Sequence, residues 1–307
     1  MRLAFAMLAL LLSGRVAFAH GIGGTVAGGP SSAPMVLACL FGVTTLLYAT
    51  GILRIRQQAG LRIVARGQSL AFGAAMTALV LILLSPLDAY ADALFSMHMI
   101  QHLILTLIVP PMLVWSRPAL VMLWAFPRSV RKEIGSAWRA GGFDRIVGRL
   151  MHPVAVGLLF SSTFAFWHLP RPYAWALNNA WAHAFEHATL FVTALMFWSL
   201  VIEPSGRRRM GVAATMTFVA GSAVISGLPG ALMLLSPEPL YPIHEAGAAQ
   251  WGLTLLEDQQ LAGLIMWIPV GLLYLVPITW LFVRLVADPQ PQWKGSRPPR
   301  RPDRLAA

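Results

Sequence analysis

Residues 69–87 read SLAFGAAMTALVLILLSPL and contain no charged side chain. A helix of roughly 20 apolar residues is long enough to cross the hydrocarbon core of a bilayer. Similar apolar runs occur along the rest of the chain, at 34–53, 95–115, 152–169, 183–202, 211–235 and 260–284. The sequence therefore predicts an all-α integral membrane protein, built as a bundle of about seven transmembrane helices.

The composition supports a membrane protein. Of the 307 residues, 57% are hydrophobic and 11% are charged, whereas about a quarter of the residues are charged in a soluble domain. The formal net charge of +11 does not indicate a nucleic-acid partner, because the basic residues lie in short loops between apolar runs. We expect membrane lipids with anionic headgroups to be their counter-charge. Cys39 is the only cysteine, which excludes an intramolecular disulfide and a cysteine-only metal site.

The positions of the basic residues predict the topology. Of the 23 Lys and Arg residues, two lie near the N-terminus and Arg171 lies in a loop predicted to be outside. All the others lie in loops or ends that alternate onto one side of the predicted bundle. Lys and Arg accumulate on the cytoplasmic side of membrane proteins. The N-terminus is therefore expected outside and the C-terminus inside.

The two ends of the chain differ from the apolar part between them. Residues 1–19 resemble a cleaved signal peptide, with an apolar stretch before Ala17-Phe18-Ala19, a small-x-small cleavage pattern. Cleavage would leave His20 at the N-terminus, either as a Cu(II) ligand or simply as the residue after the cut. We expect a flexible outer lead at 20–33, a transmembrane domain at 34–284 and a basic, proline-rich cytoplasmic tail at 285–307.

Two pairs of histidines stand out within the apolar runs. His98 and His102 lie in the predicted outer half of the third run, and His183 and His187 lie at the outer start of the fifth. Residues four apart lie on the same face of a helix. Ionisable residues at membrane depth are costly and commonly functional, and imidazole is the commonest metal ligand. The two pairs therefore predict a metal or haem site.

Three further side chains are candidates for the same site. His168 ends the fourth run, where the simpler interpretation of a lone histidine is a hydrogen bond between helices. Glu186 lies beside the second histidine pair. Asp258 opens the seventh run, either as a partner that orients an imidazole or as a favourable charge at a helix N-terminus. The candidate ligands are His98, His102, His168, His183, Glu186, His187 and Asp258. Nearby Met97 and Met99 would suit copper, but methionines also fill apolar cores.

Several blocks of sequence occur in an order typical of one known family. They are His98-Met99-Ile100-Gln101-His102 before Pro110-Pro111, Trp167-His168-Leu169-Pro170 with Tyr173, His183 with Glu186-His187, and Asp258-Gln259-Gln260-Leu261-Ala262-Gly263 before Trp267 and Pro269. In these blocks the chain resembles the CtaG family of multi-span cytochrome c oxidase assembly factors. Metal ligation by the histidines is inferred from their spacing alone.

The resemblance implies a non-enzymatic assembly factor for a respiratory haem-copper oxidase, in the inner membrane of a bacterial cell. It also implies copper handling or delivery at the outer face. The expected partners are cytochrome c oxidase subunits, with periplasmic copper chaperones as further candidates.

Other functions stay open on the sequence. Histidines from two helices could ligate haem in a membrane electron carrier. Residues 183–187 also have the spacing H-x-x-E-H, which occurs in zinc metallohydrolases. A passive transporter would suit buried polar groups, but the sequence contains no inverted repeat that would favour one.

Overall fold

The computed structural model describes residues 32–58, 64–202 and 210–287. The predicted signal peptide, His20, most of the outer lead, Arg207-Arg208-Arg209 and the tail from residue 288 lie outside these ranges. All regular elements of the described residues are helices, which confirms the predicted all-α class.

Within these ranges, six spans are long and apolar enough to cross a membrane. They are α2 (Ser32–Gln58), α3 (Arg66–Leu84), the continuous stretch of α5 (Phe95–Leu103), η1 (Ile104–Ile108) and α6 (Val109–Ser116), then α12 (Ala180–Ile202), α13 (Val212–Leu235) and α15 (Leu255–Ala287). A seventh is formed by α10 (Pro153–Trp167) and α11 (Pro170–Asn178), which meet at a 73° bend. The chain is thus a multi-span membrane protein, and its described residues form six spans, or seven if the bent pair is one.

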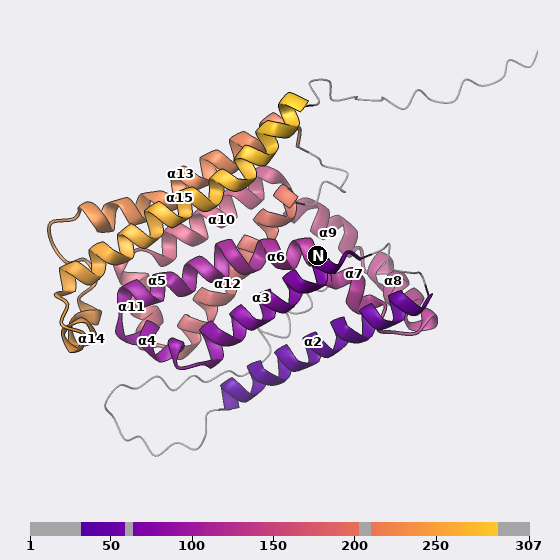
Figure 1. Ribbon diagram of the computed structural model, residues 1–307, viewed down its shortest axis with the longest axis horizontal. Coiled ribbons are helices and arrows are strands. Elements are labelled where there is room, and N and C mark those ends of the chain that lie inside the picture. Colours follow the sequence, from indigo (N-terminus) through magenta and orange to yellow (C-terminus); the bar gives the residue numbers. More distant parts are fainter. Residues whose placement is uncertain (1–31, 59–63, 203–209, 288–307) are drawn as a thin grey trace, which may run out of the picture.

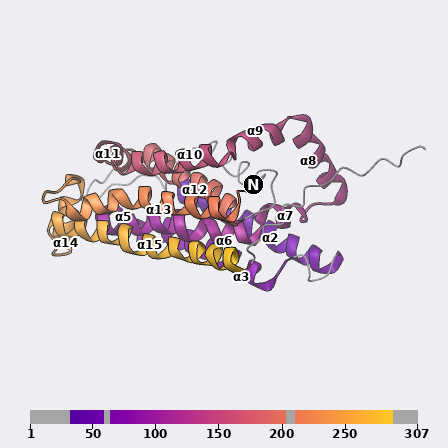
Figure 2. The same ribbon diagram turned by 90° about the horizontal axis from the view of Figure 1, so that it is seen from above.

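The spans lie side by side in an elongated bundle, and their connections gather at its two ends (Figure 1). One end holds α4 (Leu87–Ala93), α11, the 3-10 helix η2 (Pro242–His244) and α14 (Glu245–Gln250). We call it the histidine end, because the helices that carry the paired histidines begin there. The opposite end, the arginine end, holds α7 (Pro118–Leu123), α8 (Arg128–Ala140) and α9 (Phe143–Leu150). Figure 2 shows α8 and α9 as an arm that extends away from the packed spans.

Apolar side chains cover the outside of the bundle as well as its inside. Leu158 of α10, Leu232 of α13 and Val276 of α15 are each 67% exposed. Exposed apolar surface on this scale is unusual for a soluble monomer, whereas lipid tails cover it in a membrane. The faces turned inward carry most of the polar side chains that build the site described below.

Two glycines let α13 and α15 pack closely along their length. A Cβ at Gly230 would lie 3.0 Å from the carbonyl oxygen of Gly263, and a Cβ at Gly263 would lie 2.6 Å from the carbonyl oxygen of Gly230. Small residues at such contacts allow helix backbones to approach each other within a membrane. This contact fixes the start of α15, where Asp258 lies.

The double proline in the third span changes the helix from α to π just before it. Proline has no N–H to donate, so Pro110 cannot bond the carbonyl of Thr106 four residues earlier. The indole N–H of Trp198 on α12 donates to that carbonyl instead, at 2.9 Å. The π-helical stretch η1 lies directly between α5, which carries His98 and His102, and α6. This hydrogen bond therefore joins η1, one turn after His102, to α12, the helix that carries the second histidine pair.

Candidate metal centre

Both histidine pairs point into the interior of the bundle and meet there. Nε2 of His98 lies 3.0 Å from Nε2 of His102 on α5. On α12, the ring centroids of His183 and His187 are 4.3 Å apart. Across the two helices, the ring of His98 lies 5.4 Å from that of His183 and 5.8 Å from that of His187. The spacing of four residues thus brings all four imidazoles into one cluster.

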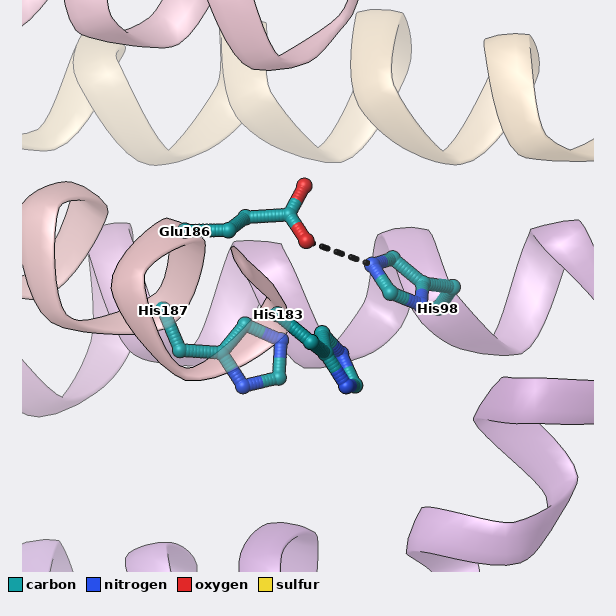
Figure 3. Close-up of side chains that lie close together, drawn as sticks. All are labelled: His98, His183, Glu186 and His187. Atoms are coloured by element: carbon teal, nitrogen blue, oxygen red, sulfur yellow. Dashed lines mark ion pairs between the residues drawn. The ribbon is translucent and has the colours of Figure 1, made fainter. Parts of the chain in front are cut away.

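Glu186 places a carboxylate among these rings. Its side chain is fully buried, with Oε2 at 3.9 Å from Nε2 of His98 and Oε1 at 3.6 Å from Nε2 of His102. Figure 3 shows the carboxylate extending from α12 toward His98. Within the described parts of the chain, neither oxygen has a hydrogen-bond partner. A carboxylate is costly to bury unless a cation or hydrogen-bond donors compensate its charge.

Four side chains are close enough to meet on one metal ion. His98, His183, Glu186 and His187 each offer a ligand atom, and these atoms all lie within 4.8 Å of one another. Nitrogen and oxygen ligands bind a transition metal at about 2.0–2.2 Å, so small side-chain rotations would bring the four atoms to a common ion. We call these four residues the metal centre.

His102 and His168 lie beside the metal centre. The ring of His168 is 5.4 Å from that of His102, so the structure brings all five predicted histidines together. Nδ1 of His168 is held by the carbonyl oxygen of Phe164, 2.6 Å away, and the phenyl ring of Phe164 stacks on the imidazole at a centroid distance of 4.2 Å. This bond joins the C-terminal cap of α10 to the same helix, so it is not the bond between helices predicted for a lone His168, and it uses only one of the two ring nitrogens.

Asp258 lies outside this cluster and accepts hydrogen bonds at the N-terminus of a different helix, α5. Its carboxylate accepts hydrogen bonds from the backbone N–H of Phe95 at 2.7 Å, from the backbone N–H of Ser96 at 3.1 Å and from the hydroxyl of Ser96 at 2.5 Å. These donors form the N-terminus of α5, where negative charge is favourable. The two predicted roles of Asp258 were a partner that orients an imidazole and a charge at the N-terminus of its own helix. The structure shows that it fixes the neighbouring helix that carries His98 and His102.

A loop at the histidine end packs over the site, and neither hydropathy nor residue spacing predicted it. The hydroxyl of Tyr173 and Nε2 of His244 are 2.6 Å apart, and Nδ1 of His244 lies 3.2 Å from the carbonyl oxygen of Ala93. Tyr241 donates to the backbone carbonyl of His168 at 2.6 Å. We call residues 236–254, which include η2 and α14, the cover. Burial lowers the pKa of His244, although the carbonyl of Ala93 and two nearby carboxylates oppose the shift.

The cover packs tightly against α4 and the start of α15. Gly247 of α14 lies so close to Ala93 that a Cβ would be 1.9 Å from the carbonyl oxygen of Ala93. Gln259 at the start of α15 accepts from the backbone N–H of Leu240 at 2.5 Å. Tyr173 belongs to the sequence blocks that suggested the family, but its contact with His244 joins residues 71 positions apart. Hydropathy and spacing carry no signal for such a contact.

Comparisons with known proteins agree with this architecture. The family described as cytochrome c oxidase caa3 assembly factor matches residues 46–288. An uncharacterized protein of Mycobacterium bovis is 27% identical over 257 residues, covering 80% of this chain and 37% of the relative. A Mycobacterium leprae protein is 25% identical over 269 residues, covering 81% of this chain and 38% of the relative.

The chain thus spans a little over a third of the length of these relatives. No solved structure matches it. The family match extends from α2 past the end of α15 and includes the metal centre, His102, His168, Asp258 and the cover. The chain belongs to the family of cytochrome c oxidase caa3 assembly factors.

Proposed function

We propose that the chain is an assembly factor that handles copper for a haem-copper oxidase, and that the metal centre holds the copper ion as cargo. One observation carries the proposal: the Glu186 carboxylate is fully buried among imidazoles, and no hydrogen bond from a described residue reaches it. A bound cation would compensate the charge of an ionised Glu186 in this buried position.

The donor set favours a metal that is bound and released. Imidazole suits copper, zinc, iron and nickel, and thioether ligands shift the preference toward Cu(I). Met99, the residue after His98 in the sequence, is fully buried and lines a small cavity with His102. The metal centre contains no thiolate, because Cys39 is exposed on α2. Without a closed thiolate cage, copper can pass on to a partner.

A bare ion suits the geometry better than haem does. Two axial histidines must hold a porphyrin between their rings, but His98 and His102 contact each other at 3.0 Å and the ring of His183 lies 5.4 Å from that of His98. The burial of Glu186 likewise favours a charge-compensating ligand over the general base of a hydrolase, which must reach a substrate and water.

The proposed setting is the inner membrane of a bacterial cell, with the histidine end outside. The support is the distribution of charge. The arm at the arginine end carries many basic side chains, Arg128, Arg131, Lys132, Arg139, Arg145 and Arg149. Such residues accumulate on the cytoplasmic side and attract anionic lipid headgroups. Copper would then arrive from outside, from a periplasmic chaperone, and the oxidase subunit would receive it there.

The delivery role can be tested in cells that depend on this chain for their oxidase. The double variant His98→Ala with His187→Ala should lower the copper-to-haem ratio of the purified oxidase, and added copper should restore it in part. His152→Ala is the matched control, because His152 is exposed and lies at the start of α10, toward the arginine end. An unchanged copper-to-haem ratio in the double variant, with normal amounts of the chain, would contradict the proposal.

A further inference from the structure

The cluster contains more buried ligands than one ion can use. Five histidines and Glu186 are gathered there, while a tetrahedral site takes four ligands. Four of these residues, the metal centre, have ligand atoms within 4.8 Å of one another. His102 and His168 are left over, although their side chains are only 1% and 4% exposed. An apolar or smaller residue would be cheaper to bury at either position unless the imidazole had a partner.

The two remaining histidines each have a buried ring nitrogen that makes no hydrogen bond to a described residue. Nε2 of His102 faces the metal centre, 3.0 Å from His98 and 3.6 Å from Glu186. Its Nδ1 is buried on the other edge of the ring and meets no hydrogen-bond partner in the described ranges. Nδ1 of His168 is occupied by Phe164, and its Nε2 is likewise buried without such a partner among the described residues.

The distance between these two rings suits a shared ion. With metal–nitrogen bonds of about 2.0 Å, two imidazoles on one tetrahedral ion have ring centroids roughly 5 Å apart. The rings of His102 and His168 are 5.4 Å apart. A small cavity also lies beside His102 and Phe164, whose ring stacks on His168, and its lining includes Met99 and Met266 but not His168 itself. It has room for about one water-sized guest.

We infer that the site has two cation positions, and that His102 and His168 bind a second Cu(I) ion next to the metal centre. The thioethers beside the cavity supply soft ligands, which Cu(I) prefers. His102 then lies between the two positions, with one nitrogen toward each. This inference rests on the proposed function, since it assigns the same cargo to both positions.

Copper stoichiometry tests the inference on the full chain in detergent. The protein is loaded with Cu(I) under a reductant, unbound copper is removed, and copper per chain is measured. The wild type should hold about two ions and His168→Gln about one, because glutamine can still donate to the Phe164 carbonyl but offers a poor ligand. His183→Gln should also hold about one ion, and the double variant none. His152→Gln serves as the control and should match the wild type.

The outcomes separate this inference from the proposed function. One ion in both the wild type and His168→Gln would overturn the second position and leave the metal centre intact. No copper in the wild type would overturn both. X-ray absorption of the fully loaded wild type needs no variant. A sulfur neighbour of copper would support the position beside Met99 and Met266, and nitrogen and oxygen neighbours alone would contradict it.

Discussion

Asp258→Asn should destabilise the protein strongly although Asp258 is no part of the metal centre. The carboxylate accepts three hydrogen bonds from Phe95 and Ser96 and is fully buried. Asparagine keeps one acceptor oxygen and places an NH2 group against a backbone donor. Hydrogen bonds to a charged group contribute about 1.5–3 kcal/mol each, and the charge at a helix N-terminus adds to this.

We therefore expect Asp258→Asn to lower the free energy of unfolding by about 3 kcal/mol and Ser96→Ala by about 1.5 kcal/mol. Reversible unfolding in mixed detergent and SDS, followed by tryptophan fluorescence, measures both. Glu245→Gln is the matched control, because this carboxylate is exposed in the first turn of α14 and should change stability by less than about 0.5 kcal/mol. If Asp258→Asn behaved like this control, the role assigned to Asp258 at the start of α5 would be wrong.

Three further perturbations test the packing around the site. Gly263→Ala places a Cβ 2.6 Å from backbone atoms of α13 and should lower the unfolding free energy by about 1–3 kcal/mol, whereas Gly271→Ala, with open space around it, should have little effect. Trp198→Phe leaves the Thr106 carbonyl without its indole donor and should cost about 1–3 kcal/mol in the same unfolding assay; an unchanged midpoint would contradict the role given to this bond. Burial lowers the pKa of His244 in the folded protein. As the pH falls, His244 is therefore protonated more readily in the unfolded chain, and the folded protein loses stability below about pH 6.5. Thermal unfolding at pH 7.5 and 5.5 should show a smaller loss for His244→Gln than for the wild type, and equal losses would refute this.

The arrangement of spans could be predicted because hydrocarbon imposes a length and a polarity on each helix. The third span illustrates this, since 95–115 was predicted and Phe95–Ser116 is observed. The fourth run behaved differently. A span was predicted at 152–169 and α10 occupies it, but the 73° bend into α11 was not predicted. Pro170 begins α11, and a residue before proline disfavours helical backbone.

The metal centre was predictable only in part, because helix periodicity predicts which residues share a face of one helix but not which helices meet. The spacing of four residues within α5 and within α12 places each histidine pair on one helix face, and this is local information. The role of Asp258 is not local, because it joins residues 163 positions apart. The cover depends on the contact between Tyr173 in α11 and His244 in η2, which no periodicity connects. The division of the histidines into two groups depends on the distances between the rings in the folded chain.

The most direct test of the central claim is the metal content of the full chain purified in detergent, measured with its visible absorbance. The comparison is a variant with His98, His183 and His187 changed to alanine and Glu186 changed to glutamine, with matching thermal unfolding as evidence that it folds. The account predicts copper bound to the wild type, copper lost from the metal centre of the variant, and no Soret band in either. A Soret band, or equal copper in both proteins, would contradict it.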